Sequence, residues 1–292
     1  MCPSTVSAYI LAGHEAQELR REDLTMSFVL IEKARPHVAL VTLNRPERMN
    51  AMAFDVMVPL RQALEEVGQD NDVRVVVLTG AGSGFCAGAD LEDAGPVPDI
   101  DGLTRPGIAR RAMGILDDVV LALRKMPQPV IGAINGPAIG GGFCLSLATD
   151  IRIASDLAYF CAAGIKNGLT ATELGMSYLL PRAIGSSRAF EIMISGRDVD
   201  AEEAARIGLV SHTVPAEELR KTCYRLADRI IAFSRLGVEI TKRLLWSSLD
   251  AGSLHSQMDA EAHAQLYVRL TTENFEEAVR ARREKRAPVF RD

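Results

Sequence analysis

Short runs of valine and isoleucine alternate with amphipathic segments through much of the chain, and this alternation constrains the fold more than any other feature. The run Val73–Leu78 is too short for a helix, and it follows residues 53–68, where apolar side chains recur at helical spacing. The same order continues as helix, strand, helix and strand at 107–126, Pro129–Ile134, 142–149 and Ile151–Ala154. Such alternation predicts parallel βαβ units.

Different patterns flank this alternating region. Phe28–Ile31 and Val38–Leu43 predict two strands that form a hairpin, and a turn signal, Asn-Arg-Pro-Glu at 44–47, closes the second strand. Beyond about residue 185 strand signals are sparse, and amphipathic helices are expected at 186–194, 201–206, 215–232, 235–249, 255–268 and 272–286. We therefore expect an N-terminal extension, an α/β core domain and a C-terminal helical region, over residues 1–25, 26–215 and 216–292.

Composition argues against several classes of function. The 292 residues carry a formal net charge of −5, without the basic excess of a nucleic-acid binder. The five cysteines are widely separated and contain no C-x-x-C pair, which is typical of reduced thiols. The N-terminal residues do not resemble a signal peptide, and no window approaches the ~20 uncharged apolar residues that cross a bilayer. We expect a soluble, cytoplasmic protein that binds neither nucleic acid nor membrane.

One glycine-rich turn follows the apolar run that ends at Leu78. Its segment Gly82–Ala87 (GSGFCA) matches the dinucleotide fingerprint G-x-G-x-x-A, so an NAD-binding Rossmann domain is an alternative. That fingerprint requires a helix that begins at the turn. Gly95, Pro96 and Pro98 follow here instead, and they cannot form the first turns of a helix. The sequence therefore disfavours NAD binding.

A second glycine-rich turn, Asn135–Gly142 (NGPAIGGG), precedes the apolar segment 143–148. Three glycines at a helix start leave backbone N–H groups uncovered by side chains, and the helix dipole adds partial positive charge there. An anionic oxygen would be stabilised at this point. The alternative is that the glycines only allow the helix to pack tightly against a strand.

The order of these stretches resembles the crotonase, or enoyl-CoA hydratase/isomerase, superfamily from about Phe28 to Phe290. The matching stretches are Leu43–Pro46 with Asn50 and Ala51, then Phe85–Leu91, Asn135–Gly142 and Gly208–Val210. The resemblance implies a spiral of repeated ββα units with a helical C-terminal part. It also implies an acyl-coenzyme A thioester as substrate with no further cofactor, and homotrimers or homohexamers in which the C-terminal helices complete a neighbour's site.

The resemblance further implies an oxyanion hole, in which each glycine-rich turn gives one backbone N–H to the thioester oxygen. By position the donors are Ala89 and Gly141. Loss of the weakly acidic α-proton puts charge on this oxygen, and one preorganised donor is typically worth roughly 2.7–4 kcal/mol. Coenzyme A contacts are expected near the adenine from Arg48, Met49 and Ala87, and near the phosphates from Lys285. Solvated surface charge is the alternative for Arg48 and Lys285.

The two glutamates of the family's hydratases are replaced here, by position, with Cys144 and Gly164. An unactivated thiol has a pKa of about 8.5, so Cys144 is expected to be a small core residue rather than a base. The acid nearby is Glu173, eight residues before Pro181, where isomerases of the family carry a catalytic acid. The alternative for Glu173 is a capping box that begins at Thr170.

A lone base is sufficient for isomerisation, because it can take the α-proton of a 3-enoyl thioester and return it at the γ-carbon. The sequence therefore favours a 3-to-2 double-bond shift. A hydratase of unusual mechanism, a thioester hydrolase, a decarboxylase and a non-catalytic acyl-CoA binding protein are the alternatives. If Glu173 is only a cap, the base is to be sought on the loop Asp90–Asp93. The histidines show no metal-binding spacing, and no metal site is expected.

Overall fold

The structure is a computed structural model that describes residues 27–291, so the predicted extension at residues 1–25 lies outside the described residues. The main sheet has the strand order β1-β2-β3-β4-β6-β9. Its β1–β2 pair is an antiparallel hairpin, and its other pairs are parallel. The bounds are β1 Val29–Arg35, β2 Val38–Leu43, β3 Val75–Gly80, β4 Val130–Ile134, β6 Ile151–Ser155 and β9 His212–Val214.

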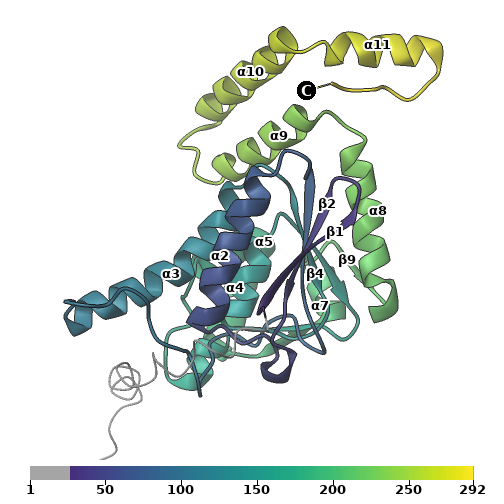
Figure 1. The fold of residues 1–292 in the computed structure, drawn as a ribbon. Coiled ribbons are helices and arrows are strands. Elements are labelled where there is room, and N and C mark those ends of the chain that lie inside the picture. Colours follow the sequence, from purple (N-terminus) through teal and green to yellow (C-terminus); the bar gives the residue numbers. More distant parts are fainter. Residues whose placement is uncertain (1–26, 292) are drawn as a thin grey trace, which may run out of the picture.

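Helices cover both faces of the main sheet. One face packs against α2, α3 and α4, and the other against α8, as Figure 1 shows. Successive strand side chains point to opposite faces, so the valine-rich runs contribute side chains to two cores. In β3, for example, Val76 and Leu78 lie in the first core, and Val75 and Val77 in the second. These helices span α2 Phe54–Gln69, α3 Arg105–Lys125, α4 Gly141–Ala148 and α8 Leu219–Ile231.

The remaining elements form a second, smaller sheet and a C-terminal arm. The small sheet has the order β5-β7-β8, with β5 Ala138–Ile139, β7 Tyr159–Cys161 and β8 Asp198–Asp200. The other helices are η1 Pro46–Arg48, η2 Ala163–Asn167, α5 Met176–Ile184, α6 Ser186–Ser195, α7 Ala201–Arg206, η3 Ala216–Glu218, α9 Arg235–Ser248, α10 Leu254–Thr271 and α11 Asn274–Glu284. Helices α10 and α11 lie beyond α9, away from the main sheet (Figure 1). Within the described chain, none of the helices is long and apolar enough to cross a membrane.

The structure confirms the predicted α/β class, the hairpin, the parallel strands and the six helices expected after residue 185. Two strands in that part, β8 and β9, are missing from the prediction, because three residues are too few to show a period. Helix α5 is missing as well, since it contains Pro181, a residue that normally ends a helix. Helix α8 belongs to the sheet's second core, so the polypeptide beyond residue 216 contributes directly to the folded core.

A buried ion pair ties α9 to this core. Lys242 is 7% exposed, and its Nζ lies 2.8 Å from Asp150 Oδ2. The same ammonium donates to the carbonyl of Gln128 at 2.8 Å, and Asp150 also accepts from the N–H of Val130 at 2.7 Å. Burial lowers the pKa of Lys242. The pair therefore fixes α9 to the beginning of β4.

Replacing Lys242 with methionine tests how much this pair contributes. Lys242→Met leaves the carboxylate of Asp150 without its ammonium partner, and removing one partner of a buried pair typically costs about 3–5 kcal/mol of unfolding free energy. Lys221→Met is the matched control, because Lys221 pairs with Glu218 on the surface and such pairs contribute about 0–1 kcal/mol. Denaturant unfolding of the two variants measures the difference. Equal losses would contradict the assigned role of the buried pair.

Candidate active site

The two glycine-rich turns lie in direct backbone contact. The N–H groups of Phe85 and Cys86 donate to Pro137 O at 3.0 and 3.1 Å, and Ile139 N–H donates to Cys86 O at 3.0 Å. A methyl group placed on Gly142 would lie 2.0 Å from Cys86 O. A backbone atom cannot move aside as a flexible side chain can, so glycine is required at position 142. Glycine at this position of the second turn therefore allows the two turns to pack closely.

Met52 fixes the orientation of the predicted donor at Ala89. Met52 N–H donates to Gly88 O at 2.7 Å, and Asp90 N–H donates to Met52 O at 3.1 Å. Both peptide groups around Ala89 are therefore held. Because the N–H and C=O of a trans peptide point in opposite directions, the Ala89 N–H points away from Met52. Ala89 itself is exposed.

The predicted donor at Gly141 begins helix α4, so its N–H has no acceptor within that helix. The preceding residue, Gly140, has a φ of 51°, and its N–H donates to Cys161 O at 2.8 Å. Its carbonyl accepts from Cys144 N–H at 3.1 Å, which turns the Gly141 N–H outward. A methyl group on Gly88 would lie 3.3 Å from Gly141 N. The structure thus brings the two predicted donors together.

Glu173 faces the same place from the loop that precedes α5. A methyl group on Gly140 would lie 3.3 Å from Glu173 Oε1. The side chain is half-buried, and burial raises the pKa of its carboxyl above the usual 4.5. The next residue, Leu174, is buried with a φ of 45°, a conformation that costs backbone energy for an L-residue. Such strain is typical of functional sites.

The capping-box alternative for Glu173 is wrong. Helix α5 begins at Met176 with Gly175 as its N-cap, and Thr170 lies in the loop before it. The carbonyl of Glu173, rather than its carboxylate, accepts from the Met176 N–H at 2.8 Å. The carboxylate is therefore left facing the glycines instead of closing a helix end.

Tight packing fills the two positions where hydratases of the family carry glutamates. Cys144 is fully buried as predicted, its thiol donates to Glu173 O at 3.4 Å, and burial raises its pKa well above the ordinary value. A methyl group on Gly164 would lie 2.1 Å from Thr170 O, so no side chain fits there without a backbone shift. Neither position can supply a base.

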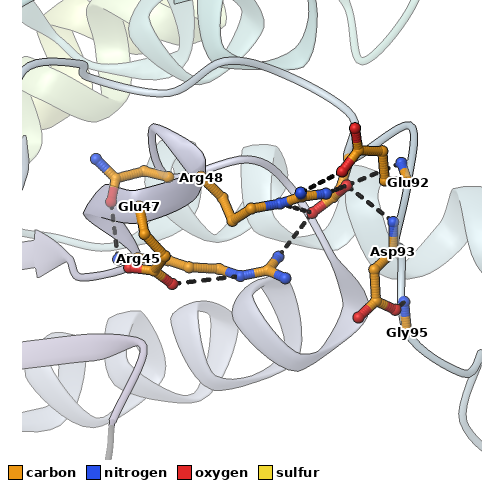
Figure 2. A network of polar contacts seen from close by, with 8 residues as sticks. Arg45, Glu47, Arg48, Glu92, Asp93 and Gly95 are labelled. Carbon is orange, nitrogen blue, oxygen red and sulfur yellow. Dashed lines mark hydrogen bonds and ion pairs between the residues drawn. The ribbon is translucent and has the colours of Figure 1, made fainter.

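The residue after Ala89 is a buried acid in a strong polar network. Asp90 Oδ2 lies 3.0 Å from Arg45 Nη1, and Oδ1 lies 2.6 Å from Arg48 Nη2. Figure 2 shows both arginine side chains reaching from one segment toward the loop of Glu92. Burial raises the pKa of Asp90, but hydrogen bonds from Arg48 and the loop backbone outweigh it and bring the pKa to about 2. A carboxylate held in this way is a poor base, which disfavours Asp90 as the alternative to Glu173.

Three of the four residues predicted to contact coenzyme A lie beside the first turn. Ala87 N–H donates to Met49 O at 3.0 Å, and Met49 is 40% exposed. Arg48 is paired with Asp90 rather than being a free surface charge. Lys285 is exposed and follows directly after α11, a helix of the C-terminal arm (Figure 1).

Sequence reasoning misses two apolar residues that border the site. A methyl group on Gly141 would lie 2.3 Å from Met52 Sδ and 3.4 Å from Leu174 Cδ1. Neither side chain carries a reactive group, so no motif points to them. One sequence signal for Met52 is available: it is an apolar residue that lies between the turn at 44–47 and the helical segment that begins at 53.

Comparison with known proteins identifies the family. A sequence model described as enoyl-CoA hydratase/isomerase matches residues 33–292. The chain belongs to this family. It is 63% identical over 290 residues to a Mycobacterium tuberculosis protein named a probable enoyl-CoA hydratase, which covers 99% of both chains.

Solved structures confirm the predicted crotonase fold. One from Mycobacterium abscessus, described as a probable enoyl-CoA hydratase/isomerase, is 64% identical and has a TM-score of 0.88 over 91% of this chain and 99% of that one. Another, from Mycobacterium smegmatis, is described as a monofunctional enoyl-CoA isomerase and is 59% identical. It covers 80% of this chain and 99% of its own, with a TM-score of 0.69. The NAD alternative loses its support, because residues 81–104 contain no helix.

Gly88 offers a test of the contact between the turns. Gly88→Ala places a methyl group 2.5 Å from Ile139 O at a φ of 80°. Gly102→Ala is the matched control, because its φ is 75° but no atom lies within 4 Å. Both carry the cost of a left-handed conformation, about 1–2 kcal/mol, and Gly88→Ala should lose about 1–3 kcal/mol more through overpacking. Denaturant midpoints measure both losses, and a Gly88 loss no larger than that of Gly102 would contradict the contact.

Proposed function

We propose that this protein is an enoyl-CoA isomerase, which moves the double bond of a 3-enoyl-CoA to position 2. Glu173 is the base, and the N–H groups of Ala89 and Gly141 form the oxyanion hole. The observation that carries the proposal is a half-buried carboxylate that faces Gly140, next to the outward N–H of Gly141. The Mycobacterium smegmatis isomerase, at 59% identity, adds support.

Each step of the reaction uses one of these groups. Glu173 removes a proton from the α-carbon, and the electron pair of that C–H bond moves into the thioester carbonyl. The resulting dienolate carries negative charge on the carbonyl oxygen, where the two N–H groups are preorganised to stabilise it. The protonated Glu173 then delivers the proton to the γ-carbon, the carbonyl re-forms, and the double bond lies between the α- and β-carbons. Water takes no part.

Hydration of a 2-enoyl-CoA is the second candidate, because the relative at 63% identity is named a probable enoyl-CoA hydratase. Water addition needs one group to activate water and another to protonate the α-carbon. Cys144 is buried with a raised pKa, and Gly164 has no room for a side chain. Glu173 would have to perform both tasks alone. The single carboxylate therefore favours the double-bond shift.

The C-terminal arm supports an oligomeric enzyme. Helix α10 has no buried residue, although Leu254, Met258 and Leu270 are apolar and at least 55% exposed. Beside α9, a cavity of about 710 Å³ is lined largely by apolar side chains. We infer that copies of the chain associate through this arm as a homotrimer or homohexamer, which would place Lys285 near the coenzyme A phosphates of a neighbouring site. Sedimentation equilibrium should give three or six chains, and a monomer would contradict this.

Replacing Glu173 with glutamine tests the base. Glu173→Gln keeps the size of the side chain but cannot accept the α-proton. We expect 3-enoyl-CoA isomerisation and α-hydrogen exchange with solvent deuterium to fall by at least about a hundredfold, while acyl-CoA binding persists. Glu65→Gln, an exposed glutamate on α2, is the control for the substitution itself. Activity on 2-enoyl-CoA in the wild type, with none on 3-enoyl-CoA, would favour the hydratase instead.

The dependence of kcat/KM on pH should reveal the same group. Only the ionised form of Glu173 can accept a proton, and burial raises its pKa above 4.5. Activity should therefore be lost on the acid side, through a midpoint that lies above 4.5 and shifts or disappears in Glu173→Gln. The raised pKa also means that the folded state is destabilised when Glu173 ionises, so relative to Glu173→Gln the wild type should lose stability as pH rises. If the loss of activity at low pH is unchanged in Glu173→Gln, a group other than Glu173 causes it.

A further inference from the structure

Asp90 is a buried carboxylate that the proposed reaction does not use. It is 3% exposed, yet it follows directly after Ala89 on an otherwise accessible loop. Its two oxygens accept from Arg45 Nη1 at 3.0 Å, from Arg48 Nη2 at 2.6 Å and Nε at 3.2 Å, and from two loop N–H groups. Those N–H groups belong to Glu92 and Asp93, at 3.0 and 2.9 Å. The acid thus holds its own loop and two arginines at once.

The arginine side of this network is rigid. Arg45 is 8% exposed, and its N–H donates to Asn50 Oδ1 at 2.9 Å. The Asn50 amide in turn donates to Ala81 O and Gly84 O, both at 2.9 Å, in the first glycine-rich turn. Asn50 is fully buried. The backbone of Arg45, whose guanidinium holds Asp90, is therefore fixed to the same turn that leads to Ala89.

The other side of Asp90 is an exposed loop. Residues 91–104 contain no helix or strand, and Leu91 is 63% exposed. Two features connect this loop to the peptide groups of Ala89. They are the backbone hydrogen bonds to Met52 and the side chain of Asp90. The backbone bonds to Met52 hold the peptide groups, and the bonds of Asp90 to two guanidinium groups add to them, because charge-assisted bonds to a guanidinium fork are stronger and fix direction.

We propose that Asp90 is a positioning residue for the oxyanion hole: clamped between Arg45 and Arg48, it holds the Ala89 N–H at the orientation that the thioester oxygen requires. The inference rests on the proposed role of Ala89. A buried carboxylate without partners would lower the free energy of unfolding. The pairs with Arg45 and Arg48 therefore allow a charged residue to lie next to the Ala89 N–H. Glu92 and Asp93 follow as the start of the loop, with their N–H groups drawn toward the same carboxylate (Figure 2).

The thioester carbonyl of a bound saturated acyl-CoA, labelled with ¹³C, reports directly on the donors. Hydrogen bonds from the oxyanion hole should lower its infrared stretching frequency in the wild type. Asp90→Asn keeps an acceptor of the same size but weakens both arginine bonds, so we expect the shift to fall by about half or more. The kcat of isomerisation should fall about ten- to hundredfold, more than KM changes, because a small misplacement weakens a donor that acts in the transition state.

Glu47→Gln is the matched control, since Glu47 approaches Arg45 at 4.0 Å from the exposed side and has no bond to the loop. It should leave the infrared shift and kcat unchanged. If Asp90→Asn does not fold, Arg45→Gln removes the buried arginine of the clamp, leaves Arg48 in place, and is expected to reduce the shift in the same direction.

A full wild-type shift in whichever of these two variants folds would overturn the inference while leaving the oxyanion hole intact. No shift in the wild type would contradict the oxyanion hole itself, and with it both the proposed function and this inference.

Discussion

The close approach of two backbone turns is the constraint on which the site depends. Cys86 O lies so near Gly142 that no Cβ can stand between them, and hydrogen bonds from Ile139 and to Pro137 hold the turns at this distance. That approach puts one peptide N–H from each turn on the same side. Both N–H groups belong to the backbone, so their positions are defined by packing rather than by side-chain rotamers, and a donor of this kind would need little reorganisation when charge develops.

The parallel sheet makes this approach possible. Strands β3 and β4 are parallel neighbours, with Val76 opposite Val130, and each leads directly into one glycine-rich turn. Parallel neighbours end at the same edge, so the two turns meet there without a long connection. The small sheet adds the third part, since β7 holds Gly140 through Cys161, and the loop between η2 and α5 brings Glu173 to the glycines. The fold thus brings two backbone N–H groups and one acid together from three separate segments.

Sequence alone predicts the parts of this arrangement that have a local signal. The valine-rich runs and helical periods define the α/β core, and the glycine spacing indicates the two turns. What the sequence does not reveal depends on long-range contacts: the short strands β8 and β9 form only through pairing, and Met52 reaches the site because it bridges to Ala89. The sequence around Glu173 leaves the capping box open for the same reason. Its local pattern fits a capping box, and only the position of α5 shows that the helix begins later.

A crystal structure of Glu173→Gln with a bound 3-enoyl-CoA would test the central claim most directly. The substitution should prevent turnover and so preserve the substrate. The account predicts the thioester oxygen at about 2.7–3.1 Å from both the Ala89 and the Gly141 nitrogen atoms, with the α- and γ-carbons on the side of residue 173. A thioester oxygen that contacts neither nitrogen, or an acyl chain that leaves residue 173 out of reach of both carbons, would contradict it.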